Sequence, residues 1–195
     1  MTIASVAEAS EVLRRGGVAL VPTDTVVGLV ASEAGLARLA RMKNRDPAKP
    51  IALLCSSSQD AFAQADKVGS LARTLARDYW PGPLTLVLDA VDGGTVGVRV
   101  PGLSVVRDLL TAYGEPLHAT SANIAGEPAP RTLEDVDERI LEAVDVVVAG
   151  EPGSGEASAV VDLSAGEARL LRSAGELTED RLRRLAEHTP FSGEV

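Results

Sequence analysis

Short, almost wholly apolar runs alternate along this chain with segments whose apolar residues recur at helical spacing. Brief apolar runs between glycine, proline and polar residues are typical of buried strands, and the longer periodic segments are typical of amphipathic helices. The apolar runs predict strands at residues 17–22, 51–55, 84–88, 95–100, 116–119, 144–149, 159–163 and 168–172. The periodic segments predict helices at residues 4–15, 33–43, 58–79 with a break near Gly69, 103–113, 132–143 and 178–187. Residues 23–28 are expected to form a loop, and Thr132 with Asp135 is expected to cap the helix at 132–143.

Strands and helices alternate, but two pairs of strands follow each other directly. This order predicts an α/β domain with a twisted, open, mixed sheet flanked by helices. The 195 residues suit one domain, because no internal repeat or linker divides the chain. Residues 189–195 are expected to form a frayed tail.

Composition narrows the classes of protein that this chain can represent. No apolar run reaches the ~18–20 residues that a membrane helix needs, and the N-terminal residues lack the basic cluster of a signal peptide. The single cysteine and two histidines exclude an internal disulfide and disfavour a zinc site. We therefore expect a cytoplasmic protein with no membrane partner and no dedicated metal site.

The net charge of −9 argues against a protein that coats nucleic acid, because such proteins are usually basic. Aromatic residues make up 3% of the chain, so the stacking platforms that bind single-stranded RNA are nearly absent. Stable binding of nucleic acid is therefore not expected. Basic residues do gather locally at Lys43, Arg45 and Lys49, which leaves room for a pocket that binds a small anion.

Four segments place polar groups near strand ends, where open α/β sheets bind ligands. They are residues 22–25 (PTDT), 43–50 (KNRDPAKP), 95–99 (TVGVR) and 120–123 (TSAN). Structural roles are also open: a turn with an Asx cap for the first segment, a favourable helix dipole for the second, and a turn before Gly126 for the last. Arg99 lies within a buried strand and needs an anionic partner, which could be a structural acid or a substrate carboxylate. Neither a phosphate-binding G-x-x-x-x-G-K-[ST] loop, a dinucleotide fingerprint nor a G-x-S-x-G nucleophile motif occurs.

Six ordered segments resemble the YrdC/TsaC family. They read PTDTVVGL, KNRDPAKP, WPGPLTLVL, VGVRVP, TSANIAGEPAP and SAVVDL followed by RLLRSAGEL. The resemblance runs from about Gly16 to about Leu177. It implies a YrdC-like twisted sheet around a large concave ligand cavity, in the short form of the family without a second domain.

The resemblance also implies an activity, that of a threonylcarbamoyl-AMP synthase. Such a nucleotidyltransferase joins L-threonine, bicarbonate and ATP, releases pyrophosphate, and supplies the tRNA threonylcarbamoyltransferase machinery that makes threonylcarbamoyladenosine. Mg²⁺ is expected to arrive bound to ATP. The alternatives are a YrdC-like paralogue without threonine chemistry, the related carbamoyl-transferring domain of hydrogenase maturation factors, and an RNA-binding module.

The family's motifs assign roles to ten residues of this chain. The resemblance implies a catalytic set of Lys43, Arg45, Ser121 and Asn123. It implies ATP contacts from Lys43, Arg45, Thr95, Asn123, Arg131 and Arg172. It implies threonine contacts from Thr23, Arg99, Ser121 and Ser158. The chain departs from many relatives at Val27, Leu54, Ala159 and Ser173, where tyrosine, histidine, threonine and proline are common.

Overall fold

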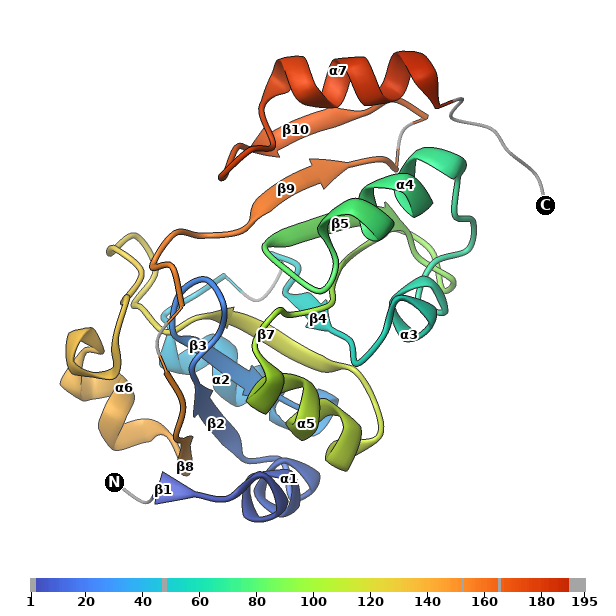
Figure 1. Ribbon diagram of the computed structural model, residues 1–195. Coiled ribbons are helices and arrows are strands. Elements are labelled where there is room, and N and C mark those ends of the chain that lie inside the picture. The colour runs from blue at the N-terminus through green and yellow to red at the C-terminus, as the bar shows by residue number, and fades with distance from the viewer. Residues whose placement is uncertain (1–2, 47–48, 152, 165, 190–195) are drawn as a thin grey trace.

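The computed structural model describes residues 3–46, 49–151, 153–164 and 166–189, and it contains one ten-stranded sheet (Figure 1). The strands lie in the order β1-β8-β2-β3-β7-β4-β6-β5-β9-β10. Their bounds are β1 Ile3–Ala4, β2 Val18–Val21, β3 Gly28–Ala31, β4 Ala52–Leu54, β5 Leu84–Asp89, β6 Thr95–Arg99, β7 Leu117–Ser121, β8 Val146–Val148, β9 Ala159–Asp162 and β10 Arg169–Arg172. The expected tail lies outside the described residues, apart from Thr189.

The sheet is mixed, as the order of elements predicts. The parallel pairs are β1 with β8, β2 with β8, β4 with β6, and β5 with β9. The other neighbours are antiparallel, and they include the chain-adjacent pairs β2–β3, β5–β6 and β9–β10. The expected α/β class with a mixed sheet is confirmed.

Two strands were not predicted. β3 begins at the end of the expected loop and pairs along its whole length with β2 and β7. β1 has only two residues, and it exists because it pairs with β8. Both are short segments whose conformation is fixed by hydrogen bonds to strands distant in the chain, so their own residues give little periodic signal.

Helices surround the sheet. The α-helices are α1 Val6–Arg14, α2 Leu36–Met42, α3 Ser58–Phe62, α4 Ser70–Tyr79, α5 Ser104–Tyr113, α6 Glu138–Ala143 and α7 Glu179–His188, and the 3₁₀ turns are η1 Glu33–Gly35 and η2 Leu133–Asp135.

Two of the expected helical segments contain less helix than predicted. The break expected near Gly69 is confirmed, because α4 begins at Ser70, but α3 already ends at Phe62, and the segment between the two helices pairs Ala65 with Ala90 in an isolated bridge. The helix expected at 132–143 is η2 followed by α6, because Asp137 caps a new helix by accepting a hydrogen bond from the Arg139 amide at 2.8 Å. The Thr132–Asp135 capping box itself is confirmed at the start of η2.

The two faces of the sheet are covered unequally. On β2, the side chains of Val18 and Leu20 pack with α2 and α6, whereas those of Ala19 and Val21 pack with α1 and α5 on the opposite face. The face covered by α2 and α6 continues over β5, β6 and β9 beneath α3, α4 and α7. On the face covered by α1 and α5, no described helix packs over β5, β6, β9 or β10, and this bare part of the sheet forms the floor of a cavity (Figure 1).

Candidate functional site

A cavity of about 480 Å³ lies on the bare part of the sheet. Strands β3 to β7 and β9 to β10 contribute to it, together with the loop after β2 and the segment that leads into β9. Its polar lining side chains belong to Thr23, Thr25, Arg45, Thr85, Thr95, Arg99, Thr120, Ser121, Ser158 and Arg172. The remaining lining is aliphatic, including Val30, Leu54, Val87 and Val160.

The charge of this lining is opposite to that of the whole protein. Arg45, Arg99 and Arg172 line the cavity, and none of the described lining residues is acidic, although the chain carries a net charge of −9. Fixed guanidinium groups in a cavity with apolar walls attract anions and bind carboxylate or phosphate through paired N–H groups. The cavity is therefore suited to an anionic ligand.

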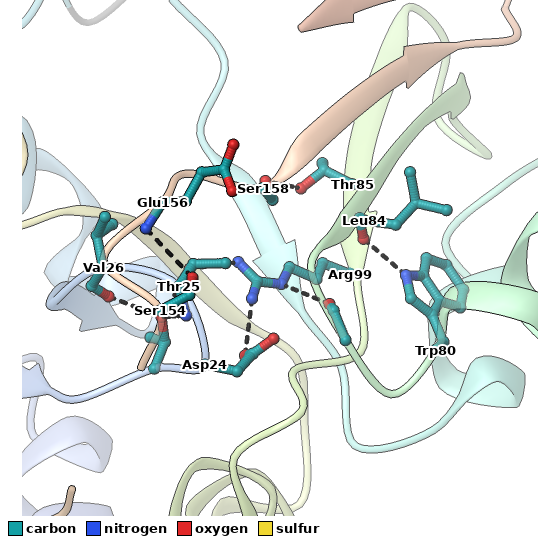
Figure 2. A network of polar contacts seen from close by, with 12 residues as sticks. Asp24, Thr25, Val26, Trp80, Leu84, Thr85, Arg99, Ser154, Glu156 and Ser158 are labelled. Atoms are coloured by element: carbon teal, nitrogen blue, oxygen red, sulfur yellow. Dashed lines mark hydrogen bonds and ion pairs between the residues drawn. The ribbon is translucent and has the colours of Figure 1, made fainter. Parts of the chain in front are cut away.

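Arg99 is held rigidly at one end of the cavity (Figure 2). Its Nε donates to the carbonyl oxygen of Gly82 at 3.0 Å, its Nη1 donates to Thr25 Oγ1 at 3.0 Å, and its Nη2 forms an ion pair with Asp24 Oδ1 at 2.7 Å. The residue is 7% exposed, and this burial lowers the pKa of Arg99 while the Asp24 carboxylate opposes the shift. The alternation along β6 is as predicted, with Val98 and Val100 in the core and Arg99 in the cavity. Arg99 therefore has a structural acid as partner, and its side chain still lines the cavity.

Arg172 approaches the cavity from β10 and is held by Ser158. Its Nε donates to the Ser158 carbonyl oxygen at 2.6 Å and its Nη2 donates to Ser158 Oγ at 3.1 Å. Ser158 Oγ is also 3.0 Å from Thr85 Oγ1, which ties β9 to β5 (Figure 2). Partial burial, and to a smaller degree the charge of Arg99, lower the pKa of Arg172. Two guanidinium groups of like charge thus lie near each other at this end of the cavity.

The loop after β2 supports the neighbourhood of Arg99. Thr23 Oγ1 accepts from the Thr25 amide at 3.1 Å and donates to the Val26 carbonyl oxygen at 2.7 Å. The expected turn is present, but Thr23 caps it rather than Asp24, whose carboxylate oxygens accept no hydrogen bond from the described residues. The segment before β9 packs on this loop, since the Ser154 amide donates to the Asp24 carbonyl oxygen at 3.2 Å and the Gly155 amide donates to that of Thr25 at 2.7 Å. The loop is therefore both a capped turn and a wall of the cavity.

Lys43 lies beside the cavity rather than in its lining. The residue is 2% exposed, and its Nζ donates to the Ser121 and Asn123 carbonyl oxygens and to Asn123 Oδ1, the last at 3.1 Å. Burial, and to a smaller degree the charge of Arg45, lower the pKa of Lys43 to about 8. Although Lys43 is the C-cap of α2, its ammonium group reaches across to the end of β7. Its three protons are matched by three acceptors, so it stabilises the turn that carries Ser121.

Asn123 belongs to the same turn. Its Oδ1 accepts from Ser121 Oγ at 2.5 Å, and its Nδ2 donates to the carbonyl oxygens of Ile124 at 2.9 Å and Glu127 at 2.7 Å. Ser121 lines the cavity, whereas Asn123 does not. The predicted Ser-x-Asn pair is therefore adjacent in space, with the serine toward the cavity and the amide engaged by the turn.

The other basic candidates occupy different positions. Arg45 lines the cavity, donates from Nη2 to the Pro50 carbonyl oxygen at 2.9 Å, and has a buried Nε without a hydrogen-bond partner among the described residues. Arg131 is exposed, and its aliphatic carbons pack near Gly155. Neither Arg131 nor the exposed Lys49 is part of the lining.

The structure brings together most of the predicted site residues. Those that line the cavity are Thr23, Arg45, Thr95, Arg99, Ser121, Ser158 and Arg172. Three further hydroxyl groups, those of Thr25, Thr85 and Thr120, line it without having been assigned a role. Thr85 stands among leucines on β5, and only its pairing with β9 reveals that it faces the cavity. Thr25 could have been found from its place in the same capped turn as Thr23.

In the part of the chain that the structure describes, no helix is long and apolar enough to cross a membrane. The same described residues contain no group of three or more His, Cys, Asp or Glu side chains placed so that they could hold a metal ion. Each hydroxyl or guanidinium group described above is suited to hydrogen bonding rather than to metal coordination.

Comparison with known proteins identifies the fold and the family. The family model for the Sua5, YciO and YrdC proteins, described as "Telomere recombination", matches residues 11–174. A threonylcarbamoyl-AMP synthase of Chromohalobacter salexigens is 34% identical over 176 residues, which cover 83% of this chain and 94% of that protein. A protein of the same name from Pyrococcus abyssi is 33% identical over 84% of this chain, which spans only 52% of that relative's length.

A solved structure agrees with these relatives. Pyrococcus abyssi Sua5 in complex with L-threonine superposes with a TM-score of 0.85 and 28% identity, over 94% of this chain and 58% of that one. The matching segment includes every strand that lines the cavity. By sequence and by fold, the chain belongs to the Sua5/YciO/YrdC family.

Proposed function

We propose that this chain is a threonylcarbamoyl-AMP synthase, a nucleotidyltransferase that converts L-threonine, bicarbonate and ATP to threonylcarbamoyl-AMP and pyrophosphate. The observation that carries the proposal is the cavity lined by three arginines and several hydroxyl groups, with no acid in its described lining. The names of the relatives support the same reaction.

The reaction gathers anions, and the cavity supplies the opposite charge. The threonine amine attacks the carbon of bicarbonate, whose hydroxide leaves as water with a proton from the amine, and a carbamate forms. The carbamate oxygen then attacks the α-phosphorus of ATP, and the bond to the β-phosphate breaks as pyrophosphate leaves. Threonine carboxylate, carbamate and triphosphate repel one another, so fixed cations must offset this repulsion before and during the reaction. Positioning of the reactants then supplies much of the remaining acceleration.

The arginines of the cavity have different parts in this proposal. Arg99 receives the threonine carboxylate. Its Nε and one N–H of Nη1 donate to Gly82 and Thr25, while the buried Nη2 pairs with Asp24 by charge and has no hydrogen-bond partner among the described residues. Arg45 and Arg172 receive phosphate oxygens. Arg45 offers a buried Nε that has no hydrogen-bond partner among the described residues. Hydroxyl groups such as that of Ser158 orient the threonine between them.

Ser121, Lys43 and Asn123 work as one unit in this proposal. Ser121 touches the substrates, while Lys43 and Asn123 hold the turn that presents it. A shift of a few tenths of an ångström in this turn would move the serine relative to the α-phosphorus. The predicted phosphate contacts of Lys43 and Asn123 would require these two side chains to exchange their present partners for ATP. Thr95 contacts ATP from within the lining, and Arg131 would do so only by reaching in from outside it.

Mg²⁺ accompanies ATP in this proposal. Because the described lining holds no carboxylate, the ion would be bound by the phosphates and water, with the protein holding the complex through Arg45 and Arg172. The product would pass to a tRNA threonylcarbamoyltransferase system in the cytoplasm. Product formation requires no stable contact between this chain and RNA.

The decisive experiment measures pyrophosphate release from Mg²⁺–ATP by the purified chain, with L-threonine and bicarbonate present together or omitted one at a time. The proposal expects release that requires both, with threonylcarbamoyl-AMP detected by mass spectrometry. Release that is independent of threonine would indicate a paralogue with other chemistry. No release, with RNA binding that weakens steeply with salt, would instead indicate an RNA-binding module.

A further inference from the structure

Asp24 is a buried carboxylate directly behind Arg99, and the reaction described above does not use it. The carboxylate is an ion-pair partner of the Arg99 guanidinium at 2.7 Å. Both of its oxygens are inaccessible to solvent and have no hydrogen-bond donor among the described residues. Figure 2 shows Asp24 on one side of the guanidinium, with Ser158 and Thr85 on the other.

Two loops pack closely against Asp24. A Cβ atom at Gly102 would lie 3.1 Å from the carboxyl carbon of Asp24, and one at Gly153 would lie 2.4 Å from its carbonyl carbon. The approach is so close that only glycine fits at Gly153 without a shift. With both carboxylate oxygens inaccessible to solvent, the charged partner of Asp24 among the described residues is Arg99.

The other arginines of the cavity have no such partner. Arg45 donates to a backbone carbonyl oxygen, and Arg172 donates to the backbone and hydroxyl oxygens of Ser158. No ion pair with a carboxylate is formed by either of them within the described residues. Of the three arginines that line the cavity, Arg99 is thus the one paired with a carboxylate among the described residues, whereas Arg45 and Arg172 are not.

We infer that Asp24 makes the Arg99 end of the cavity selective for a zwitterion, an α-amino acid, over a plain carboxylate or a phosphate. The inference rests on the proposed function and adds a specificity-determining residue to it. A ligand carboxylate on the cavity side of Arg99 is attracted by the guanidinium and repelled by Asp24. The α-ammonium group of an amino acid is attracted by Asp24 through the poorly screened interior and offsets that repulsion. Asp24 acts without touching the ligand, and phosphates are directed to Arg45 and Arg172.

The test compares L-threonine with 3-hydroxybutyrate, which has the same carboxylate, hydroxyl and methyl groups but lacks the ammonium group. Binding of both is measured by calorimetry to the wild-type chain and to Asp24→Asn, which keeps the shape of the side chain and removes its charge. We expect the wild type to prefer threonine by tenfold or more. In the variant, 3-hydroxybutyrate should bind more tightly while the affinity for threonine changes little, so that the preference falls at least fivefold.

A control is Asp162→Asn, which removes the buried acid of another ion pair, one whose arginine is exposed. Asp162 contacts Arg169 at 2.5 Å on β9 and β10, and it is not part of the cavity lining. This variant should lose stability and keep the wild-type preference. If Asp24→Asn weakens the binding of threonine and of 3-hydroxybutyrate by the same factor, Asp24 only holds Arg99 in place, and the inference is overturned. If Asp24→Asn fails to fold, the ratio of the wild-type affinities for threonine and 3-hydroxybutyrate serves as the test, and a ratio below three overturns the inference. Absence of threonine-dependent pyrophosphate release would overturn the proposed function separately.

Discussion

Lys43 offers a quantitative prediction because its ammonium group is buried and fully hydrogen-bonded. Burial lowers its pKa to about 8, whereas an exposed lysine has a pKa of 10.5. Between these values, the unfolded chain binds a proton at this position that the folded chain does not bind. The free energy of unfolding must then rise with pH across this window. Below pH 8, the buried charge of the Lys43 ammonium group lowers the free energy of unfolding. This destabilisation disappears as the pH approaches 10.5.

The size of the effect follows from the same two values. At ~1.4 kcal/mol for each unit, the difference between the two pKa values corresponds to about 3 kcal/mol of unfolding free energy. About 2.5 kcal/mol of this change falls between pH 7 and pH 10. Lys43→Met has no titrating group at this position. The difference in unfolding free energy, wild type minus Lys43→Met, should therefore become about 2.5 kcal/mol more positive between pH 7 and pH 10.

The assay is urea unfolding of both proteins at several pH values in that range, which cancels the titration of all other groups. Lys49→Met, which removes an exposed lysine from the segment after α2, is the matched control. A difference between wild type and Lys43→Met that stays constant with pH would refute the reasoning. Catalysis should change in the opposite direction. As Lys43 loses its proton, one of its three acceptors loses a donor and Ser121 is held less firmly, so activity should fall with an apparent pKa near 8.

Three further substitutions test the cavity itself. Arg99→Lys keeps the charge and loses the planar fork, so the KM for threonine should rise about tenfold, equivalent to ~1.4 kcal/mol, with little change for ATP; equal effects on both substrates would argue against a carboxylate site. Arg45→Ala should raise the KM for ATP at least tenfold. If Arg45 only interacts with the helix dipole, the variant would lose ~0.3–1 kcal/mol of stability and keep its KM for ATP. Arg41→Ala, in the last turn of α2, is the control for a change in helix-dipole energy alone. Gly153→Ala would place a Cβ 2.2 Å from the Thr23 carbonyl oxygen, so we expect a loss of ~1–3 kcal/mol in thermal unfolding together with reduced threonine binding; unchanged values for both would contradict the packing described here.

The sequence predicts the parts of this fold that depend on local patterns. Apolar runs predict the central strands because these are buried on both faces, as the fully buried side chains of β2 show. Alternation along β6 correctly predicts that Arg99 faces away from the core. The Thr132–Asp135 cap is also correct, because a capping box depends on residues only three apart.

The features that the sequence could not predict depend on contacts between distant residues. Strand β3 exists because β2 and β7 provide its hydrogen bonds. The ion pair of Asp24 with Arg99 joins the loop after β2 to strand β6, and no local pattern distinguishes this aspartate from one that only caps a turn. The position of Lys43 beside the cavity depends on the turn after β7, some 80 residues further along the chain.

Between β8 and β9 the chain crosses almost the entire sheet, from its second strand to its ninth (Figure 1). The end of this crossing holds the loop after β2 through Ser154 and Gly155, and then supplies Ser158 to Arg172. The contacts of Ser154 and Gly155 with the loop after β2 join residues far apart in the sequence, and loop closure costs entropy before such contacts exist. A ligand in the cavity bridges strands from both halves of the sheet. Its binding would therefore oppose global unfolding rather than the opening of one loop, by about RT ln(1 + [L]/Kd) when only the folded chain binds it.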